Sequence, residues 1–177
     1  SKNGMAVLLY GAPGTGKTHC AETIAYETGK TLKSVNYSQV LSMYVGGTEK
    51  ALDELFKEVA DSNTILLFDE ADALFAKRTS VNNSIDRYSN VETDVLLKLI
   101  ENSNVFAILT TNVVDNIDEA FFRRLSYIVK FDCPDRKLRK KIWEILIPEK
   151  LPLAKDVDLD KLAEKYEFTG GDIKNAI

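Results

Sequence analysis

The sequence predicts an α/β fold, a three-layer α/β/α sandwich with a five-stranded parallel sheet, followed by an incomplete all-helical part. Short apolar runs alternate with stretches in which apolar residues recur at the 3.6-residue period of a helix. The runs at 5–10, 65–68 and 105–109 are apolar on both faces. Strands of a parallel sheet have this character because helices bury both of their sides. Beyond the last apolar run, only helical patterns follow.

Strands and helices are expected in regular alternation. The strands are predicted at residues 5–10, 31–36, 65–68, 105–109 and 127–131. The helices between them are predicted at 16–27, 48–59 and 89–99. Their ends are marked by a cap at Gly29, an N-cap at Thr48 and a capping box formed by Ser89 and Glu92. Further helices are predicted at 135–147, at 158–166 and from Gly170 onward.

The organisation of the chain changes once, near Pro134. We expect a large α/β subdomain over residues 1–134 and a partial, truncated helical subdomain over residues 135–177. The chain opens about four residues before a predicted core strand and stops inside a starting helix, so we infer a fragment of a longer protein.

Composition excludes several classes of protein. The formal net charge of −4 disfavours a dedicated nucleic-acid binder, because such proteins usually carry excess positive charge. No apolar stretch approaches the roughly 18 residues of a membrane-spanning helix, so we expect no membrane span in this segment. Cys20 and Cys133 have no zinc-ligand spacing around them and are expected to be reduced. Together with the absence of a signal peptide, this favours a cytoplasmic location.

A phosphate-binding loop follows the first strand. Residues 11–18 read GAPGTGKT and fit the pattern G-x-x-x-x-G-K-[ST] between a strand and a helix. Glycines let consecutive N–H groups surround phosphate oxygens, Lys17 can reach the β and γ phosphates, and the Thr18 hydroxyl can bind Mg²⁺. The expected nucleotide-binding residues are Gly11, Ala12, Pro13, Gly14, Thr15, Gly16, Lys17, Thr18 and His19, the last at the helix surface beside the loop. The fold is therefore expected to be that of a P-loop NTPase.

Two further strand ends carry polar residues. The apolar run at 65–68 ends in Asp69, expected to hold Mg²⁺, and Glu70, expected to act as general base toward the attacking water. Asn112 follows the fourth strand and could position that water. An ordinary turn residue explains Asn112 equally well, since its place beside the loop depends on a strand order that spacing does not determine.

These residues resemble the AAA family of ATPases, within the AAA+ group. The resemblance covers nearly the whole chain and is carried by the loop at 11–18, FDEADALF at 68–75, TTN at 110–112 and the stretch 116–124. It implies ATP or ADP and Mg²⁺ as ligands, with Asn112 at the sensor 1 position. It also implies that Arg123 and Arg124 are arginine fingers acting on the ATP of a neighbouring subunit, so that hydrolysis needs a ring, usually a hexamer.

The resemblance extends to three less specific segments. Tyr44, Val45 and Gly46 occupy the place of the family's first pore loop, which could grip an extended polypeptide, although Tyr44 and Val45 could instead pack under the preceding helix. The polar stretch 78–89 matches the second pore loop in position, and a plain surface loop explains it almost equally well. Gly170 and Gly171 resemble the start of the helix that faces adenine, and an ordinary helix start remains open.

The expected function is ATP binding and Mg²⁺-dependent hydrolysis by a ring ATPase that remodels or unfolds protein substrates. A DNA-directed AAA+ motor or clamp-loader-like switch shares the nucleotide chemistry, and the net charge and Tyr44 argue against it. A nucleotide-gated scaffold without catalysis is disfavoured by the complete set of expected catalytic residues. We expect the isolated fragment to hydrolyse ATP poorly, because a lone subunit receives no arginine from a neighbour.

Overall fold

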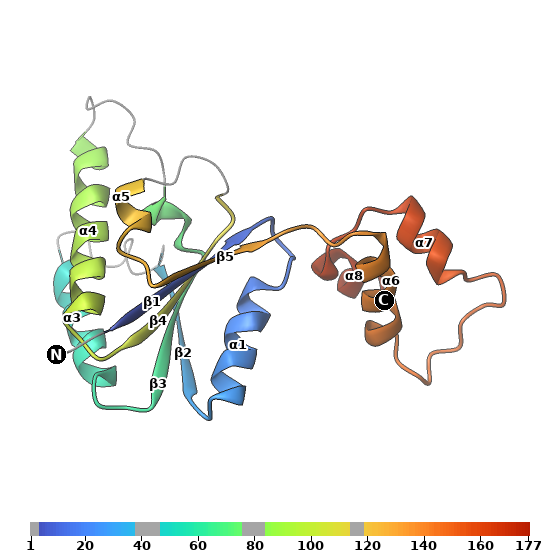
Figure 1. Ribbon diagram of the computed structural model, residues 1–177, viewed down its shortest axis with the longest axis horizontal. Coiled ribbons are helices and arrows are strands. Elements are labelled where there is room, and N and C mark those ends of the chain that lie inside the picture. Colours follow the sequence, from blue (N-terminus) through green and yellow to red (C-terminus); the bar gives the residue numbers. More distant parts are fainter. Residues whose placement is uncertain (1–3, 38–46, 76–83, 114–118) are drawn as a thin grey trace. The chain divides into compact units, whose positions relative to one another are not determined.

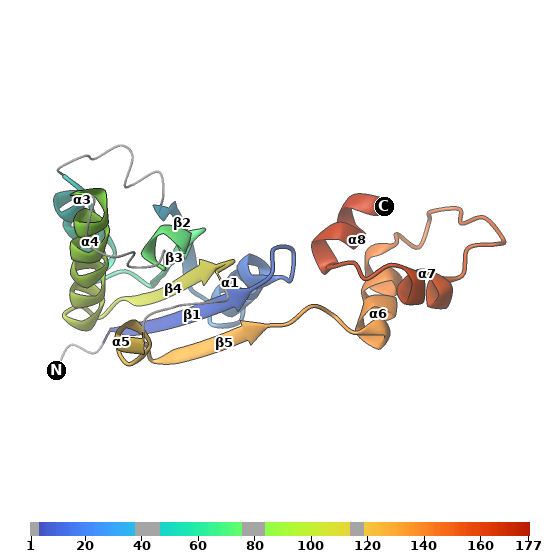
Figure 2. The same ribbon diagram turned by 90° about the horizontal axis from the view of Figure 1, so that it is seen from above.

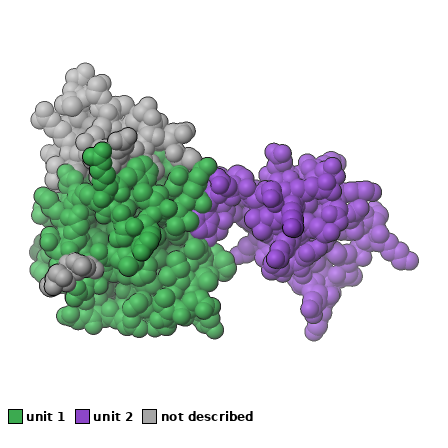
Figure 3. Space-filling model, in the orientation of Figure 1, with its two compact units in different colours: residues 1–10, 17–130 green, residues 11–16, 131–177 purple. Residues whose placement is uncertain are grey.

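A computed structural model describes residues 4–37, 47–75, 84–113 and 119–177 (Figure 1). The chain divides into two compact units, shown in different colours in Figure 3. The first, here called the sheet unit, comprises residues 1–10 and 17–130. The second, the helical unit, comprises residues 131–177 together with residues 11–16, which form the glycine-rich turn after the first strand.

The predicted five-stranded sheet is confirmed. Its strands are β1 (Met5–Gly11), β2 (Thr31–Asn36), β3 (Thr64–Asp69), β4 (Phe106–Thr111) and β5 (Tyr127–Phe131). They lie in the order β2-β3-β4-β1-β5. The pairs β1–β4, β2–β3 and β3–β4 are parallel, and Figure 2 shows β5 running beside β1 in the same direction. The carboxyl ends of all five strands therefore lie along one edge.

Helices cover the sheet on both faces, which makes the three predicted layers. Figure 1 shows α1 (Lys17–Glu27) on one side and α3 (Thr48–Val59) and α4 (Ser84–Glu101) on the other. Strand residues alternate between the two layers, as period-two geometry requires. Leu66 and Phe68 belong to the cluster that includes Leu52 and Leu96 of α3 and α4. The intervening Leu67 is buried outside that cluster.

Two predicted helix starts in the sheet unit are wrong. The N-cap of α3 is Gly47, and Thr48 is the first residue of the helix. The helix α4 begins at Ser84, so the predicted capping box at Ser89 lies inside it, and the stretch predicted as a loop at 78–89 is helical from Ser84. No glycine or proline interrupts 84–101, and extending an existing helix costs less than starting one. Residues 78–83 lie outside the described residues.

Two short elements complete the described sheet unit. A 3₁₀ helix, η1 (Ala71–Leu74), follows β3, and α5 (Glu119–Phe122) precedes β5. The predicted cap at Gly29 is confirmed, since this glycine has φ of 64° and its N–H donates to the carbonyl of Tyr26. In the described ranges of the chain, no helix combines the length and apolar character needed to cross a bilayer.

The helical unit contains α6 (Arg136–Leu146), α7 (Leu159–Lys165) and α8 (Gly170–Ala176), which confirms the three predicted helices. Asp135 caps α6 by accepting the N–H of Leu138, and Asp158 caps α7. The buried Arg139 of α6 donates to the carbonyls of Ala163 and Pro134, which fixes α6 against α7.

Candidate nucleotide site

The structure gives the strand order, which spacing does not determine. β4 lies between β1 and β3, with Thr111 paired to Tyr10 and Leu109 paired to Phe68. Asn112 therefore leaves the sheet from the strand directly beside β1, after which the glycine-rich turn begins. Ligands of open parallel sheets bind beyond this edge, where the carboxyl ends of the strands lie.

The carboxylate of Asp69, at the end of β3, is surrounded by hydroxyl groups. The Thr18 hydroxyl donates to its two oxygens at 3.1 and 3.3 Å, and the buried Thr110 hydroxyl donates to Oδ1 at 2.5 Å. These are hard oxygen donors, and Mg²⁺ in phosphate sites uses one or two protein oxygens together with phosphates and water. The donor set formed by Thr18 and Asp69 fits Mg²⁺.

Lys17 is held inside the sheet unit and is only 7% exposed. Burial lowers the pKa of its ammonium from the ordinary value of 10.5, and the carboxylates of Asp72 and Asp69 partly oppose this by raising it. A buried cation is stabilised further by an added negative charge. A phosphate group meets that requirement.

Glu70 is held in an unusual backbone conformation by both neighbouring strands. Its φ of 54° and ψ of 43° lie in the left-handed region, and among the described residues no other non-glycine has positive φ. Its N–H donates to the Thr110 hydroxyl at 3.2 Å, and the Asn36 side chain donates to its Oε2, also at 3.2 Å. Strain of this kind persists where the surroundings determine the conformation, and it is typical of functional sites.

Asp72 connects η1 to the end of β4. Its Oδ1 accepts the Thr111 hydroxyl at 2.6 Å and the backbone N–H of Asn112 at 2.9 Å. Asn112 is exposed, whereas Thr111 is 1% exposed. The backbone of Asn112, the residue expected at the sensor 1 position, is thus hydrogen-bonded to η1, which directly follows Asp69 and Glu70.

Within the helical unit, the turn at 11–16 is joined closely to the start of α8. The N–H of Gly171 donates to the carbonyl of Gly14 at 2.9 Å. Gly14 has φ of 74°, and a Cβ there would lie 2.5 Å from the Thr169 hydroxyl; a Cβ on Gly171 would lie 2.9 Å from the Cα of Gly14. Both positions therefore require glycine. The expected residues Gly170 and Gly171 thus lie against Gly14 of the glycine-rich turn, which contains Ala12, Pro13, Thr15 and Gly16 as well.

The two adjacent arginines differ in their surroundings. Arg124 makes a two-pronged ion pair with Glu101, at 2.7 and 3.0 Å, and contacts Asp94 at 3.2 Å. Hydrogen bonding to Arg124 lowers the pKa of Glu101. Arg123 is exposed at the end of α5. Of the two residues expected as fingers, Arg124 is engaged by α4 of its own chain.

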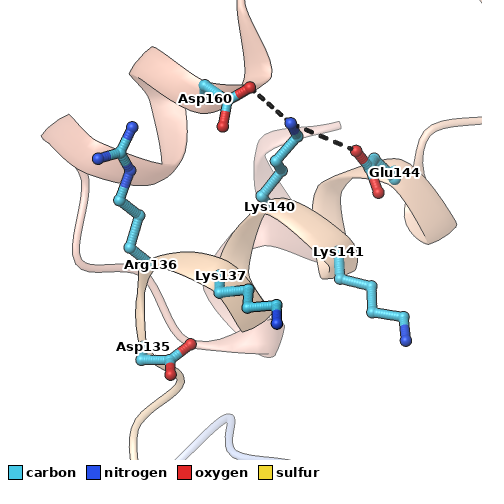
Figure 4. Close-up of a pocket in the computed structure, with 7 residues that line it drawn as sticks. All are labelled: Asp135, Arg136, Lys137, Lys140, Lys141, Glu144 and Asp160. Atoms are coloured by element: carbon cyan, nitrogen blue, oxygen red, sulfur yellow. Dashed lines mark hydrogen bonds and ion pairs between the residues drawn. The ribbon is translucent and has the colours of Figure 1, made fainter.

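Of the remaining predicted residues, the structure describes His19. His19 is exposed on α1, with its Nδ1 3.4 Å from Glu22. Tyr44, Val45 and Gly46 lie outside the described residues. A hollow of about 790 Å³ opens in the helical unit, lined only by charged residues, as Figure 4 shows. Its lining includes Lys140, which pairs with Asp160 and Glu144, and shows no apolar side chain of the kind that receives a base.

Sequence reasoning did not single out Asn36, Thr110, Thr111 or Thr169 as residues of the site. A shared signal was available, because each of the first three stands at the carboxyl end of a strand, and Thr110 and Thr111 are polar where the interior of β4 is apolar. Thr169 is the N-cap of α8, and its hydroxyl makes a capping box with Asp172.

The chain is similar to known proteins. Residues 7–133 match the family model described as ATPase family associated with various cellular activities (AAA). The chain is 36% identical over 173 residues to a cell division cycle protein 48 homolog of Archaeoglobus fulgidus, which covers 95% of this chain and 24% of that protein. It is also 36% identical over 176 residues to the 26S proteasome regulatory subunit 4 homolog B of Arabidopsis thaliana, covering 95% of this chain and 40% of that protein.

The chain therefore spans less than half the length of these relatives. The family match nevertheless spans the glycine turn, Asp69, Glu70, Asn112 and the two arginines. This chain belongs to the AAA family of ATPases.

Proposed function

We propose that this chain is the ATP-binding and hydrolysing module of an AAA ring ATPase that remodels or unfolds protein substrates. The observation that carries the proposal is the arrangement at the end of β3. There Thr18 and Thr110 hold the Asp69 carboxylate, and Glu70 is fixed next to it by the two flanking strands. Membership of the AAA family supports the same function.

In this proposal the nucleotide is held chiefly by backbone groups and one cation. The N–H groups of the turn at 11–16 surround the β and γ phosphates, and the Lys17 ammonium neutralises them. Thr18 and Asp69 hold Mg²⁺, which when bound neutralises charge developing on the transferred phosphoryl group. The start of α8 at Gly170 and Gly171 provides a close backbone surface for the base.

Hydrolysis is assigned to three residues of the sheet unit and one of a neighbour. Glu70 takes a proton from the attacking water, and the Asn36 amide holds its carboxylate in place before the reaction. The Asn112 side chain orients the same water. Arg123 of an adjacent copy stabilises the transition state, whereas Arg124 braces α5 against α4 through Glu101.

The assembly and substrate are inferred from the relatives. Similarity to a cell division cycle protein 48 homolog and to a proteasome regulatory subunit supports a ring that acts on proteins. We propose that this ring is a homo-oligomer, specifically a hexamer. In such a ring Tyr44, Val45 and Gly46 are proposed to contact the substrate polypeptide. We further propose a cytoplasmic location, and a functional division into an α/β subdomain over 1–134 and a helical lid over 135–177.

The central test replaces Glu70 by glutamine in the assembled protein. Glu70→Gln should keep ATP affinity within about twofold and lower the hydrolysis rate by roughly 10²- to 10⁴-fold, the range that general-base catalysis supplies. Affinity is measured by calorimetry and turnover by phosphate release. Turnover at the wild-type rate would show that Glu70 is not the base.

A mixing experiment tests the role of Arg123. Arg123→Ala and Glu70→Gln proteins should each be inactive alone, because each lacks one half of every site. Mixed before assembly, they should regain part of the activity, since some interfaces then join an intact Glu70 to an intact Arg123. No recovery in rings shown by mass spectrometry to be mixed would contradict a finger acting between subunits. Arg124→Ala serves as the comparison and should lower thermal stability.

A further inference from the structure

Asp72 links two elements at the edge of the sheet where the strands end. It lies in η1, two residues after Glu70, and a single oxygen, Oδ1, accepts two hydrogen bonds from the end of β4. One bond comes from the Thr111 hydroxyl and the other from the backbone N–H of Asn112. The turn that follows β3 is therefore tied to the residue at which β4 ends.

Burial of Thr111 makes its hydrogen bond to Asp72 costly to break. Thr111 is 1% exposed, so its hydroxyl depends on Asp72 for an acceptor, because a buried donor left without one is costly. The same hydroxyl oxygen accepts the N–H of Val113 at 3.1 Å. Thr111 and Asp72 together thus bond the backbone N–H groups of Asn112 and of the residue after it. The backbone of Asn112 is held, while its side chain remains exposed at the edge of the sheet.

We propose that Asp72 is a positioning residue for ATP hydrolysis, which holds the backbone of Asn112 so that the Asn112 amide meets the attacking water. This inference rests on the proposed function, in which Asn112 orients that water. Asp72 itself contacts no reacting atom. It acts by removing backbone freedom that the transition state would otherwise have to restrict.

The two hydrogen bonds need an acceptor oxygen and no charge, which makes a conservative variant informative. Asp72→Asn retains an acceptor oxygen at the same position, whereas Asp72→Ala removes it. The charge of Asp72 also raises the pKa of Lys17, so comparing the two variants separates the acceptor from the charge.

The test is a double-mutant cycle on kcat in the assembled protein, at saturating ATP and Mg²⁺. Asp72→Ala should lower kcat about 10-fold, as expected for losing two hydrogen bonds, while ATP affinity stays within about twofold. Asp72→Asn should retain at least about half of the wild-type kcat. In an Asn112→Ala background, Asp72→Ala should lower kcat by less than about twofold, because the residue it positions is already gone. Hydrogen exchange at the Asn112 amide should become faster in Asp72→Ala.

Two further variants keep the test decisive. Thr111→Val preserves shape, removes the hydroxyl and should reproduce the same pattern, even if Asp72→Ala proves unstable. Asp53→Ala, which removes a partly exposed carboxylate paired with Lys57 on α3, is the matched control and should leave kcat unchanged.

The outcomes separate the two claims. If Asn112→Ala lowers kcat and Asp72→Ala adds its full loss on top, the positioning role of Asp72 is wrong while the role of Asn112 stands. If Asn112→Ala leaves kcat unchanged, the proposed role of Asn112 fails, and the role of Asp72 fails with it.

Discussion

The end of β3 and the glycine turn after β1 are built by different means. At the end of β3, side chains make the connections: the hydroxyls of Thr18 and Thr110 donate to Asp69, and the Asn36 amide donates to Glu70. In the turn at 11–16, backbone makes them: the N–H of Gly171 donates to the carbonyl of Gly14, with no room for a Cβ on either residue.

The difference predicts which substitutions each region tolerates. A region joined by side chains tolerates a conservative swap that preserves the hydrogen-bonding group, and loses function when that group is removed. A region joined by backbone is indifferent to side-chain chemistry and sensitive to added volume.

Lys17→Met should weaken ATP binding by roughly 100-fold, because it removes the cation that is proposed to neutralise the phosphates. The same change should raise the thermal stability of the protein without nucleotide, since burial of the ammonium is unfavourable and lowers its pKa. Calorimetry measures the affinity for ATP, and thermal unfolding measures the stability.

The pH dependence of unfolding tests whether burial of the Lys17 ammonium is the cause of this stability difference. Above the lowered pKa of folded Lys17 and below 10.5, the unfolded chain binds the proton that the folded chain has released. Wild-type stability should therefore gain a contribution as pH rises through this window, and Lys17→Met should lack that contribution. Identical profiles for the two proteins would contradict the burial argument.

Gly171→Ala should weaken ATP binding by about 10-fold or more, because the new methyl group would lie 2.9 Å from the Cα of Gly14 and force the two segments apart. Gly29→Ala is the matched control. Gly29 has φ of 64° and open space around it, so alanine there adds backbone strain without any clash. Equal ATP affinity for the Gly171→Ala protein and the wild type would show that close backbone packing between Gly171 and Gly14 is not needed for ATP binding.

Thr110→Val should lower kcat about 10-fold, as expected for losing a hydrogen bond to a charged group and leaving the Glu70 N–H without its acceptor. Valine matches threonine in shape, so the fold should be kept. Thr110→Ser retains the hydroxyl and should keep most of the activity. Should serine and valine reduce kcat equally, the hydroxyl is not what matters at this position.

Asp172→Asn should produce the smallest effect, confined to the pH dependence of stability. Hydrogen bonds from the N–H and hydroxyl of Thr169 lower the pKa of Asp172 from its ordinary value of 3.8. The stabilisation is therefore present above that value and is lost as pH falls through the lowered pKa of the folded protein. The asparagine variant should show a flatter acid limb in thermal unfolding, and an unchanged limb would argue against the capping box.

Local patterns predicted most of the architecture. Apolar periodicity located the five strands and the three helices of the helical unit, because burial on two faces or on one stripe leaves its period in the sequence. Periodicity was not followed back to the start of α4, where Ile85 and Tyr88 are the two apolar residues of the mostly polar segment from Ser84 to Ser89. Helix propagation costs less than helix initiation, so two apolar residues at helical spacing are enough to extend the helix by these turns.

The chemical groups that the chain offers can be identified from short stretches of sequence, because the loop at 11–18 and the acids Asp69 and Glu70 each lie within a few consecutive residues. How those groups are held depends on contacts that form when the chain folds. Asn36 reaches Glu70 across 34 positions and Thr110 reaches Asp69 across 41, and Arg124 is bound by an acid 23 positions away. Contacts between residues so far apart in the chain depend on strand order and helix packing. Neither produces a periodic pattern or a fixed spacing in the sequence, so these contacts could not be predicted from it.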